Sequence, residues 1–415
     1  MEAKSFEISK RAVWEAYKKI KANRGAAGVD QESIGGFEEK LEDNLYKIWN
    51  RLASGSYFPP AVRGVEIPKK DGKKRLLGIP TVADRVAQMV VKMSLEPKVE
   101  FHFHPDSYGY RPKKSAVEAV RVARQRCWQY DWVIDVDIKG FFDNLDHELL
   151  MKAVEKHTDS KWERLYIQRW LKAPMEMGND IQEERKKGTP QGGVISPLLS
   201  NLFLHYAFDQ WMSRNHPANP FERYADDIVV HCQTEERARE LRAQIGERMA
   251  ECKLELHPEK TRIVYCKDDN RRGSYPEQQF DFLGYGFQPR TSKNYLGQYF
   301  VSFRPAVSRE SVKKMRATIR SWRIHLRSGM EIREIAQQIN PVVRGWILYY
   351  GQFRRSALYV TLRQLDCSLV KWARRKYKNL RTHWKGTWYW LGEMAKHEPE
   401  LFVHWQMGYR GTTGR

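Results

Sequence analysis

Residues 221–232 read FERYADDIVVHC, the most informative segment of this chain. Two adjacent carboxylates, Asp226 and Asp227, stand between two short apolar runs. The β-branched run at residues 228–230 predicts a buried strand directly after them. Because turns tolerate aspartate well, we expect the acid pair at the tip of a strand–turn–strand unit. Most such pairs are solvated turns, but carboxylates at a hairpin tip are also ligands for hard divalent cations such as Mg²⁺.

A second acidic stretch can supply a third carboxylate. Residues 132–138 read WVIDVDI, so a strand here would place Asp135 and Asp137 on one face and apolar side chains on the other. These acids either form the solvent-exposed face of an edge strand or lie opposite Asp226 and Asp227 in the fold. The second interpretation predicts a two-metal site for phosphoryl transfer.

These segments resemble the palm of reverse transcriptases, and further motifs follow in that family's order between residues 65 and 290. The resemblance implies that Asp137, Asp226 and Asp227 are the catalytic carboxylates. Together with the backbone carbonyl of Ile138, they would bind two Mg²⁺ ions, with Mn²⁺ as a possible substitute.

The resemblance also implies residues near the incoming nucleotide. Phe142 falls where an aromatic side chain blocks a ribose 2′-hydroxyl. The motif GTPQGG at residues 188–193 places Gln191 near nucleotide and template. The motif FLGY at residues 282–285 resembles the primer grip.

Three basic residues are candidates for contact with the triphosphate. Residues 67–75, IPKKDGKKR, look like a fingertip hairpin in which Lys69 and Arg75 bind the triphosphate; the alternative is a solvated basic loop. Residues 256–261, LHPEKT, resemble the motif whose lysine, here Lys260, faces the leaving pyrophosphate; the segment also suits a plain strand entry.

Further segments resemble one branch, the bacterial group II intron-encoded reverse transcriptase/maturase. They read AAGVD, GIPTVADR, SYGYRP and, in the maturase segment, INPVVRGW (residues 26–30, 78–85, 107–112 and 339–346). Arg111 and Arg344 lie in two of them as candidate nucleic-acid contacts, although Arg111 equally suits a structural carboxylate. The terminal LFVHW at residues 401–405 suits members without a C-terminal endonuclease domain. The partners implied are group II intron RNA, a DNA target and primer, and dNTPs.

Charge also indicates a polyanionic partner. The chain has 415 residues, a net charge of +21 and a pI near 9.6. Residues 301–415 carry 23 Lys and Arg against 7 Asp and Glu, and 7 of the 14 Trp. Cations interleaved with aromatic side chains suit phosphate neutralisation combined with base stacking.

One predicted helix combines an apolar face with a basic surface. Ser308 can cap a helix that ends just before Gly329, and its apolar face would be Val312, Met315, Ile319, Trp322 and Leu326. The candidate nucleic-acid contacts on the remaining surface are Lys313, Arg316, Arg320 and Arg323.

The predicted fold class is α+β. We expect a right-hand polymerase, with fingers and a palm that contains an antiparallel sheet, followed by an α-helical thumb/maturase domain. The expected limits are an N-terminal extension at 1–60, fingers and palm at 61–300, thumb/maturase (X) domain at 301–380 and a basic, Trp-rich tail at 381–415. Within the fingers we expect a helix from Asp84 that Pro97 stops.

The expected compartment is the reducing cytoplasm. The N-terminus has no secretory signal pattern, and no apolar run approaches the ~20 residues that a membrane span needs. Five scattered cysteines indicate neither a disulfide framework nor a zinc site.

Three functions remain open. The first is an RNA-directed DNA polymerase that copies intron RNA and binds it as a maturase for splicing and retrohoming. The second is an RNA-binding splicing cofactor without polymerase activity, which the presence of Asp137, Asp226 and Asp227 disfavours. The third is a domesticated reverse transcriptase in phage defence or DNA repair, which the presence of a group II intron around the gene would exclude.

Overall fold

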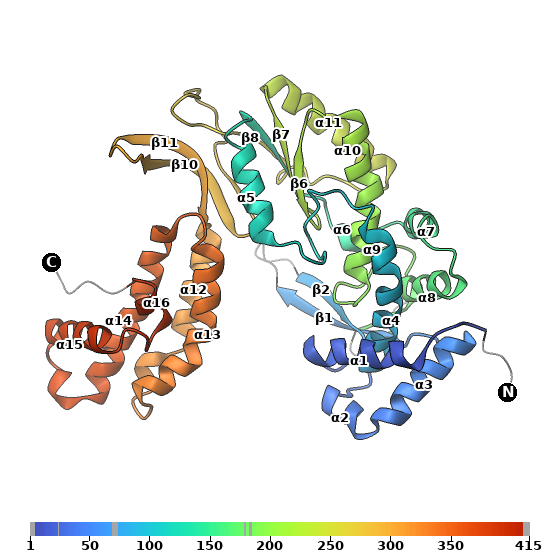
Figure 1. The fold of residues 1–415 in the computed structure, drawn as a ribbon, viewed down its shortest axis with the longest axis horizontal. Coiled ribbons are helices and arrows are strands. Elements are labelled where there is room, and N and C mark those ends of the chain that lie inside the picture. Colours follow the sequence, from blue (N-terminus) through green and yellow to red (C-terminus); the bar gives the residue numbers. More distant parts are fainter. Residues whose placement is uncertain (1–4, 24, 69–73, 178–179, 182–184, 410–415) are drawn as a thin grey trace. The chain divides into compact units, whose positions relative to one another are not determined.

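The computed structural model describes every residue except 1–4, 24, 69–73, 178–179, 182–184 and 410–415. The chain divides into two compact units. The first unit contains residues 1–115 and 134–262, and the second contains residues 116–133 and 263–415. Figure 1 labels the elements of both.

The first unit combines helices with short strands. Its helices are α1 (Lys10–Asn23), α2 (Ile34–Glu39), α3 (Leu41–Ser54), α4 (Val82–Glu100), α6 (Phe141–Asn144), α7 (His147–Glu155), α8 (Lys161–Lys172), α9 (Ser196–Leu204), the π-helix η1 (His205–Asp209), α10 (Gln210–Asn215) and α11 (Glu235–Glu251). Its strands are β1 (Val62–Pro68), β2 (Lys74–Ile79), β4 (Met175–Met177), β5 (Asp180–Ile181), β6 (Phe221–Tyr224) and β7 (Asp227–Cys232), while β3 (Trp132–Val136) and β8 (Arg262–Tyr265) cross the unit boundary along the chain.

Helix α4 is the centre of the first unit, because α1, α2, α3, α8 and α9 all pack against it. Its N-cap is Thr81, whose side chain accepts a hydrogen bond from the Asp84 amide. The predicted stop at Pro97 is wrong, since the helix continues to Glu100. Proline removes one backbone hydrogen bond, but burial of Val99, two residues further on, favours continuing the helix.

Two four-stranded sheets belong to this part of the chain, in the orders β2-β1-β4-β5 and β6-β7-β3-β8. Strands β6 and β7 form an antiparallel hairpin. The predicted alternation along residues 132–138 is confirmed: Val136 and Ile138 are buried, whereas Asp135 and Asp137 keep partial solvent access.

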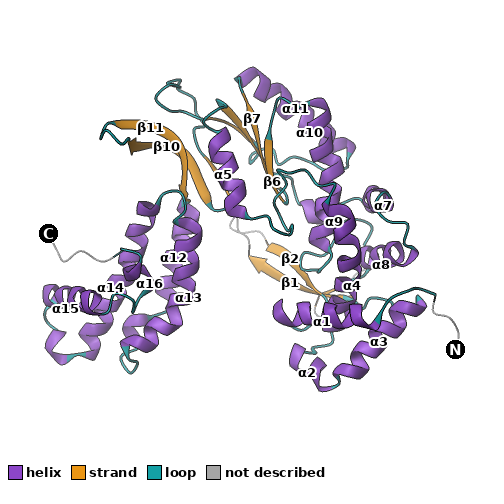
Figure 2. Ribbon diagram, viewed as in Figure 1, coloured by secondary structure: helices purple, strands orange, loops and turns teal. Residues whose placement is uncertain are grey.

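The second unit is mainly helical (Figure 2). It contains α5 (Ala116–Arg126), β9 (Phe280–Phe282), β10 (Tyr285–Lys293), β11 (Tyr299–Val307), α12 (Arg309–Ser321), η2 (Ile324–Leu326), α13 (Ile332–Tyr350), η3 (Arg355–Leu358), α14 (Tyr359–Lys376), η4 (Lys378–Leu380), α15 (Trp384–His397) and α16 (Val403–Gln406). Strands β9, β10 and β11 form an antiparallel sheet. Antiparallel pairing in the chain and a helical C-terminal region agree with the α+β class.

Helix α12 begins as predicted, because the Ser308 side chain accepts a hydrogen bond from the Ser311 amide. It ends earlier than predicted, at Ser321, and Leu326 is exposed rather than part of a buried face. Arg323 has a left-handed backbone (φ 47°), which breaks the helix, and Trp322 stacks on Trp346 at 5.7 Å between ring centroids.

Residues 384–406, expected within a tail, are folded. Phe402 and Trp405 are buried in the same hydrophobic core as α12, α13 and α14. Asn340 of the maturase segment fixes the last turn: its amide donates to the Leu401 carbonyl at 2.9 Å and its oxygen accepts from the Val403 amide at 3.1 Å. The maturase segment therefore contacts the C-terminal segment within one unit.

The composition predicted neither a membrane span nor a disulfide framework. Among the described helices, none combines the length and apolar character needed to cross a membrane. None of the five cysteines forms a disulfide.

Candidate active site

The carboxylate pair sits at the tip of the β6–β7 hairpin, so the predicted strand–turn–strand unit is confirmed. Tyr224 pairs with Asp227, which leaves Ala225 and Asp226 as the turn. Ala225 has φ +56°, a left-handed conformation that costs an L-residue about 1–2 kcal/mol. Such strain persists only where surrounding contacts hold the backbone in place.

A fully buried arginine holds this turn. The guanidinium of Arg223 donates to both carboxylate oxygens of Asp209, at 2.7 and 2.6 Å. One of its terminal nitrogens also donates to the Ala225 carbonyl at 3.1 Å and to the Asn201 side chain at 3.0 Å. A paired and fully hydrogen-bonded buried charge resists displacement, so it fixes the backbone that carries Asp226.

The SYGYRP segment supports the same hairpin from its edge. The Tyr108 amide donates to the Arg223 carbonyl at 2.8 Å, and the Arg223 amide donates to the Asp106 carbonyl at 3.0 Å. A Cβ on Gly109 would lie 2.3 Å from the Ala225 nitrogen, so only glycine allows this close approach.

The third carboxylate is anchored through its backbone. The Asp137 amide donates to the Thr261 hydroxyl at 3.2 Å, and its carbonyl accepts from the His257 amide at 2.8 Å. Ile138 forms an isolated β-bridge with Leu256. Asp137 thus lies at the end of β3, held by the LHPEKT segment.

The carboxylates influence one another electrostatically. Asp227 lies at the hairpin tip with part of its surface open to solvent. Desolvation by the surrounding protein nevertheless raises the pKa of Asp227 to about 7, and repulsion from Asp226, Asp135 and Asp137 adds to the rise. Burial also raises the pKa of Asp226, with repulsion from Asp137 adding to it and nearby Arg75 opposing it. These mutually repelling oxygen donors fit a hard divalent cation. They do not converge on one point: among the described residues, no three His, Cys, Asp or Glu side chains lie close enough to hold a metal ion.

The structure brings Arg75 and Gln191 together. The Arg75 guanidinium donates to the Gln191 side-chain oxygen, and the Gln191 amide donates to Asp143 at 3.3 Å. The Gly78 amide also donates to the Gln191 carbonyl at 2.9 Å. The β1–β2 hairpin and the GTPQGG loop therefore contact each other through predicted site residues.

Phe142 lies beside the same loop, on α6. Its ring is buried and meets Phe141 at 5.3 Å between centroids. Its carbonyl accepts from the Thr189 amide at 2.8 Å. A Cβ on Gly188 (φ +80°) would lie 2.7 Å from the Asp143 carbonyl oxygen, so the loop and α6 are in close contact.

Three further residues were predicted to contact the nucleotide or the nucleic acid, and their surroundings differ. The Lys260 ammonium is 4.0 Å from Asp137, and both side chains are about half exposed (53% and 40%). Arg111 points inward, donating to Glu100 at 3.0 and 2.8 Å and to two backbone carbonyls. It therefore takes the structural role of the two considered for it. Lys69 lies outside the described residues.

A family model described as reverse transcriptase (RNA-dependent DNA polymerase) matches residues 67–287, more than half of the chain. The chain belongs to the reverse transcriptase family. A second model, the group II intron maturase-specific domain, matches residues 312–390 of this reverse transcriptase.

Curated relatives agree with both matches. The reverse transcriptase is 32% identical to protein YkfC of Escherichia coli over 286 residues, which cover 58% of this chain and 73% of YkfC. It is 38% identical to the group II intron-encoded protein LtrA of Lactococcus lactis over 194 residues, covering 46% of this chain and 32% of LtrA. It is 23% identical to nuclear intron maturase 4 of Arabidopsis thaliana over 193 residues, covering 46% of this chain and 23% of that protein.

These matches confirm the predicted function class, an RNA-directed DNA polymerase with a group II intron maturase domain. Reverse transcriptases use divalent metal ions, in agreement with the donor set at the hairpin tip.

Two supporting groups of the reverse transcriptase were missed from the sequence. One is the Arg223–Asp209 pair; an arginine in the strand just before the acid pair was the available signal for a buried acidic partner. The other is Gln88 on α4, whose side-chain oxygen accepts from the Val194 amide at 2.8 Å and whose amide donates to Asp84 at 2.9 Å. No local pattern indicated that Gln88 supports the GTPQGG loop.

His205, beside Asp209 in η1, should make the reverse transcriptase sensitive to acid. The imidazole is buried and accepts from the Gln210 amide at 3.0 Å, so burial lowers the pKa of His205 to about 4, which Asp209 only partly opposes. Because the folded pKa is below the unfolded value of about 6.5, this residue costs stability as pH falls from about 6.5 to about 4. His205→Gln should remove up to about 3 kcal/mol of that pH dependence.

Urea unfolding of both proteins at pH 7 and pH 4.5 measures this difference. The exposed His383 provides the matched control, His383→Gln, which should follow the wild-type pH dependence. Equal pH dependence in wild type and His205→Gln would show that the imidazole is not held neutral.

Proposed function

We propose that this reverse transcriptase copies group II intron RNA into DNA at Asp137, Asp226 and Asp227, and that it binds the intron as a maturase during splicing and retrohoming. The observation that carries the proposal is the electrostatic coupling of Asp226 and Asp227, on a braced hairpin tip, to Asp137 at the end of a neighbouring strand. Mutually repelling carboxylates of this kind are stabilised when divalent cations bind between them.

The proposed reaction is attack of a primer 3′-hydroxyl on the α-phosphate of a dNTP, with pyrophosphate leaving. Asp137, Asp226, Asp227 and the Ile138 carbonyl would hold two Mg²⁺ ions, for which Mn²⁺ can substitute. When bound, these ions increase the acidity of the 3′-hydroxyl and neutralise the triphosphate.

The chain's other residues would position the substrate. We propose that Lys69 and Arg75 bind the triphosphate, Gln191 the nucleotide and template, and Lys260 the leaving pyrophosphate, to which it can donate a proton. The Arg75–Gln191 contact supports a shared site for the first two groups.

We also propose the right-hand polymerase arrangement. In it residues 61–300 form fingers and palm, 301–380 the thumb/maturase domain, and 1–60 an N-terminal extension. Residues 381–415 would then complete the thumb, a role supported by the burial of Phe402 and Trp405.

Primer extension tests the polymerase function. Purified protein, an RNA template with an annealed DNA primer, dNTPs and Mg²⁺ should give full-length DNA, and EDTA should stop synthesis. A splicing cofactor without polymerase activity would bind the same RNA and give no extension.

Phe142→Ala should admit ribonucleotides. Removing the ring opens space where the 2′-hydroxyl would collide, so the preference for dNTP over rNTP, measured as a ratio of kcat/KM values, should fall at least about tenfold. Phe142→Tyr is the matched control, because it keeps the ring and should keep the preference. A preference equal to that of wild type in Phe142→Ala would make Phe142 a core residue only.

The basic surface of α12 and of Arg323, just beyond its end, is the proposed intron RNA contact. Lys313, Arg320 and Arg323 are exposed, and Arg316 is partly so. Among the described residues, none provides an ion-pair partner for any of these four cations. Arg344 is exposed on α13 of the same unit, and we propose it as a further contact. Unpaired cations on one surface suit a phosphate backbone.

Replacing Lys313, Arg316, Arg320 and Arg323 with Gln should weaken binding of structured RNA. The slope of log Kd against log salt concentration should flatten by about one unit for each phosphate that the protein no longer neutralises. Cations already paired on the same unit, Arg333 with Glu398 and Lys396 with Glu393, provide the control Arg333→Gln/Lys396→Gln. An unchanged slope in the quadruple variant would place the RNA elsewhere.

A further inference from the structure

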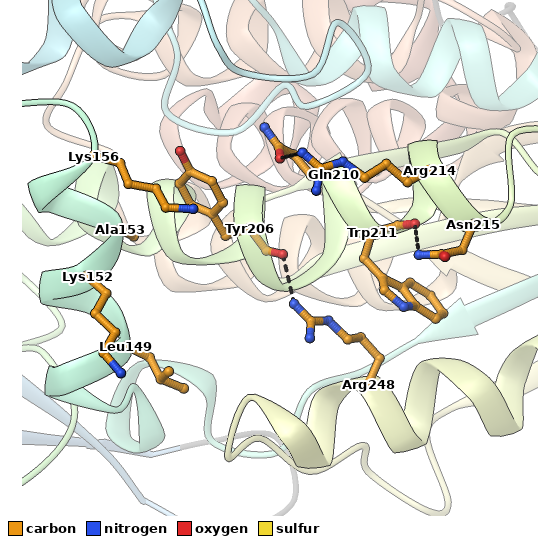
Figure 3. A pocket seen from close by; sticks show the side chains of 10 residues that line it. All are labelled: Leu149, Lys152, Ala153, Lys156, Tyr206, Gln210, Trp211, Arg214, Asn215 and Arg248. Atoms are coloured by element: carbon orange, nitrogen blue, oxygen red, sulfur yellow. Dashed lines mark hydrogen bonds between the residues drawn. The ribbon is translucent and has the colours of Figure 1, made fainter.

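The first unit contains a basic cavity that the proposed active site does not use. It has a volume of about 430 Å³ and lies between α7, the η1–α10 segment and α11 (Figure 3). Its four cations are Lys152, Lys156, Arg214 and Arg248. Its two aromatic side chains are Tyr206 and Trp211, and its described lining includes no Asp or Glu.

Arg248 is fixed in place rather than mobile on the surface. Its guanidinium donates to the backbone carbonyls of Tyr206 and Ala207, both at 3.1 Å, and to the Glu251 carboxylate at 2.9 Å. Figure 3 shows it reaching from α11 across the cavity toward η1. Arg248 therefore connects α11 to η1 and fixes the wall of the cavity, with each of its three guanidinium nitrogens already engaged.

The aromatic side chains are also oriented. The Tyr206 hydroxyl is hydrogen-bonded to His157 at 2.8 Å, and the Lys156 ammonium lies 4.6 Å from the centroid of the Tyr206 ring. Trp211 meets His216 edge to face at 4.6 Å. Tyr206 belongs to the π-helix η1, an irregularity that is frequent at functional sites.

The remaining cations are available to a ligand. Arg214 donates to the Gln210 side chain at 2.9 Å. Lys152 and Lys156 are exposed, and within the part of the chain that the structure describes neither forms an ion pair. An excess of positive charge in a concave site favours an anion, and the adjacent Trp211 ring favours a planar group attached to it.

We propose that this cavity binds one nucleotide unit of single-stranded RNA. Lys152, Lys156 and Arg214 contact the flanking phosphates, and the base stacks on Trp211. The cavity volume is within the range of small-ligand sites, roughly 300–1,000 Å³. The side-chain oxygen of Asn215, which also lines the cavity, supplies a hydrogen-bond acceptor for a base edge or for the 2′-hydroxyl. The inference rests on the proposed function for its choice of RNA as the ligand.

Photo-crosslinking with a single-stranded RNA that contains 5-bromouridine tests the site directly. Mass spectrometry of the irradiated wild-type protein should identify an adduct on Tyr206 or Trp211. The variant Lys152→Gln/Lys156→Gln should lose at least about 80% of this adduct, because it removes two of the phosphate-binding cations. The control Lys47→Gln/Lys161→Gln removes the same charge from exposed positions outside the cavity and should keep it. Adducts elsewhere but none on Tyr206 or Trp211 would overturn the proposal.

Affinity measurements provide the second readout. The log–log salt slope for the RNA should flatten by about 1.4 in Lys152→Gln/Lys156→Gln, since each single-strand phosphate contributes about 0.7. Trp211→Leu should weaken binding by about fivefold or more. Slopes and affinities equal to those of the control would overturn the proposal.

Two further experiments distinguish RNA from other ligands, and the cavity proposal from the proposed polymerase function. An equal adduct from 5-bromouridine monophosphate, or from the matching single-stranded DNA, would overturn the assignment to RNA. Primer extension on a short template–primer should be unchanged in Lys152→Gln/Lys156→Gln. If wild type fails to extend a primer, the proposed polymerase function fails, while the adduct still reports on the cavity.

Discussion

Asp226→Asn should lower the rate of primer extension by at least about 10³-fold and leave the affinity for structured RNA within about twofold. The substitution keeps the size of the side chain and removes one charge from the carboxylate set at the β6–β7 tip. Charge stabilisation by a bound metal is worth several kcal/mol in the transition state, and about 4 kcal/mol corresponds to 10³-fold. RNA affinity is retained because the proposed RNA contacts lie on other elements.

Single-turnover extension at saturating dNTP and Mg²⁺ gives the rate, and filter binding gives the affinity. Asp159→Asn is the matched control: it makes the same chemical change at a fully exposed position paired with Arg164, and it should extend primers normally. A rate within about tenfold of wild type for Asp226→Asn would remove Asp226 from the catalytic set.

Arg223→Met should destabilise the protein by about 3–5 kcal/mol, the largest stability effect that we expect from a single substitution. The methionine keeps an unbranched apolar stem, but it removes the guanidinium that pairs with the buried Asp209 carboxylate and donates to the Ala225 carbonyl. An uncompensated buried charge costs this much because it loses both its hydration and its ion pair.

The strained turn makes the effect reach the active site. Ala225 stays at φ +56° while Arg223 holds its carbonyl, so losing the guanidinium allows the turn to relax and move Asp226. Extension at low temperature, where the variant remains folded, should therefore fall as well.

Two variants separate this explanation from a general packing defect. Arg223→Met/Asp209→Leu replaces both charges, so it should recover most of the lost stability but not the extension activity. Arg239→Met removes an exposed ion pair with Glu235 and should change stability by less than about 0.5 kcal/mol. Urea midpoints measure all three. A loss below about 1 kcal/mol for Arg223→Met would show that the buried pair contributes little.

Local patterns in the sequence correctly predicted several elements. The β-branched run after Asp227 correctly predicted strand β7, the acid–apolar alternation predicted β3, and Ser308 predicted the start of helix α12. These predictions succeed because the periods of strand and helix are short-range properties, written within a few residues of one another. Predictions that depended on a stopping point were weaker: α4 continues through Pro97, and α12 ends before Leu326.

Short runs of neighbouring residues were enough to predict the family and the acid pair at a hairpin tip. The distant side chains that support this tip became identifiable only from the packing of the elements. Arg223 and Asp209 are 14 positions apart, Gln88 and Val194 are 106 apart, and Arg111 pairs with Glu100, which is 11 positions away. The repeat of a helix or a strand does not connect residues in different elements. A buried charge or amide must find a partner of complementary geometry, and that partner is set by how the elements pack rather than by their local sequence.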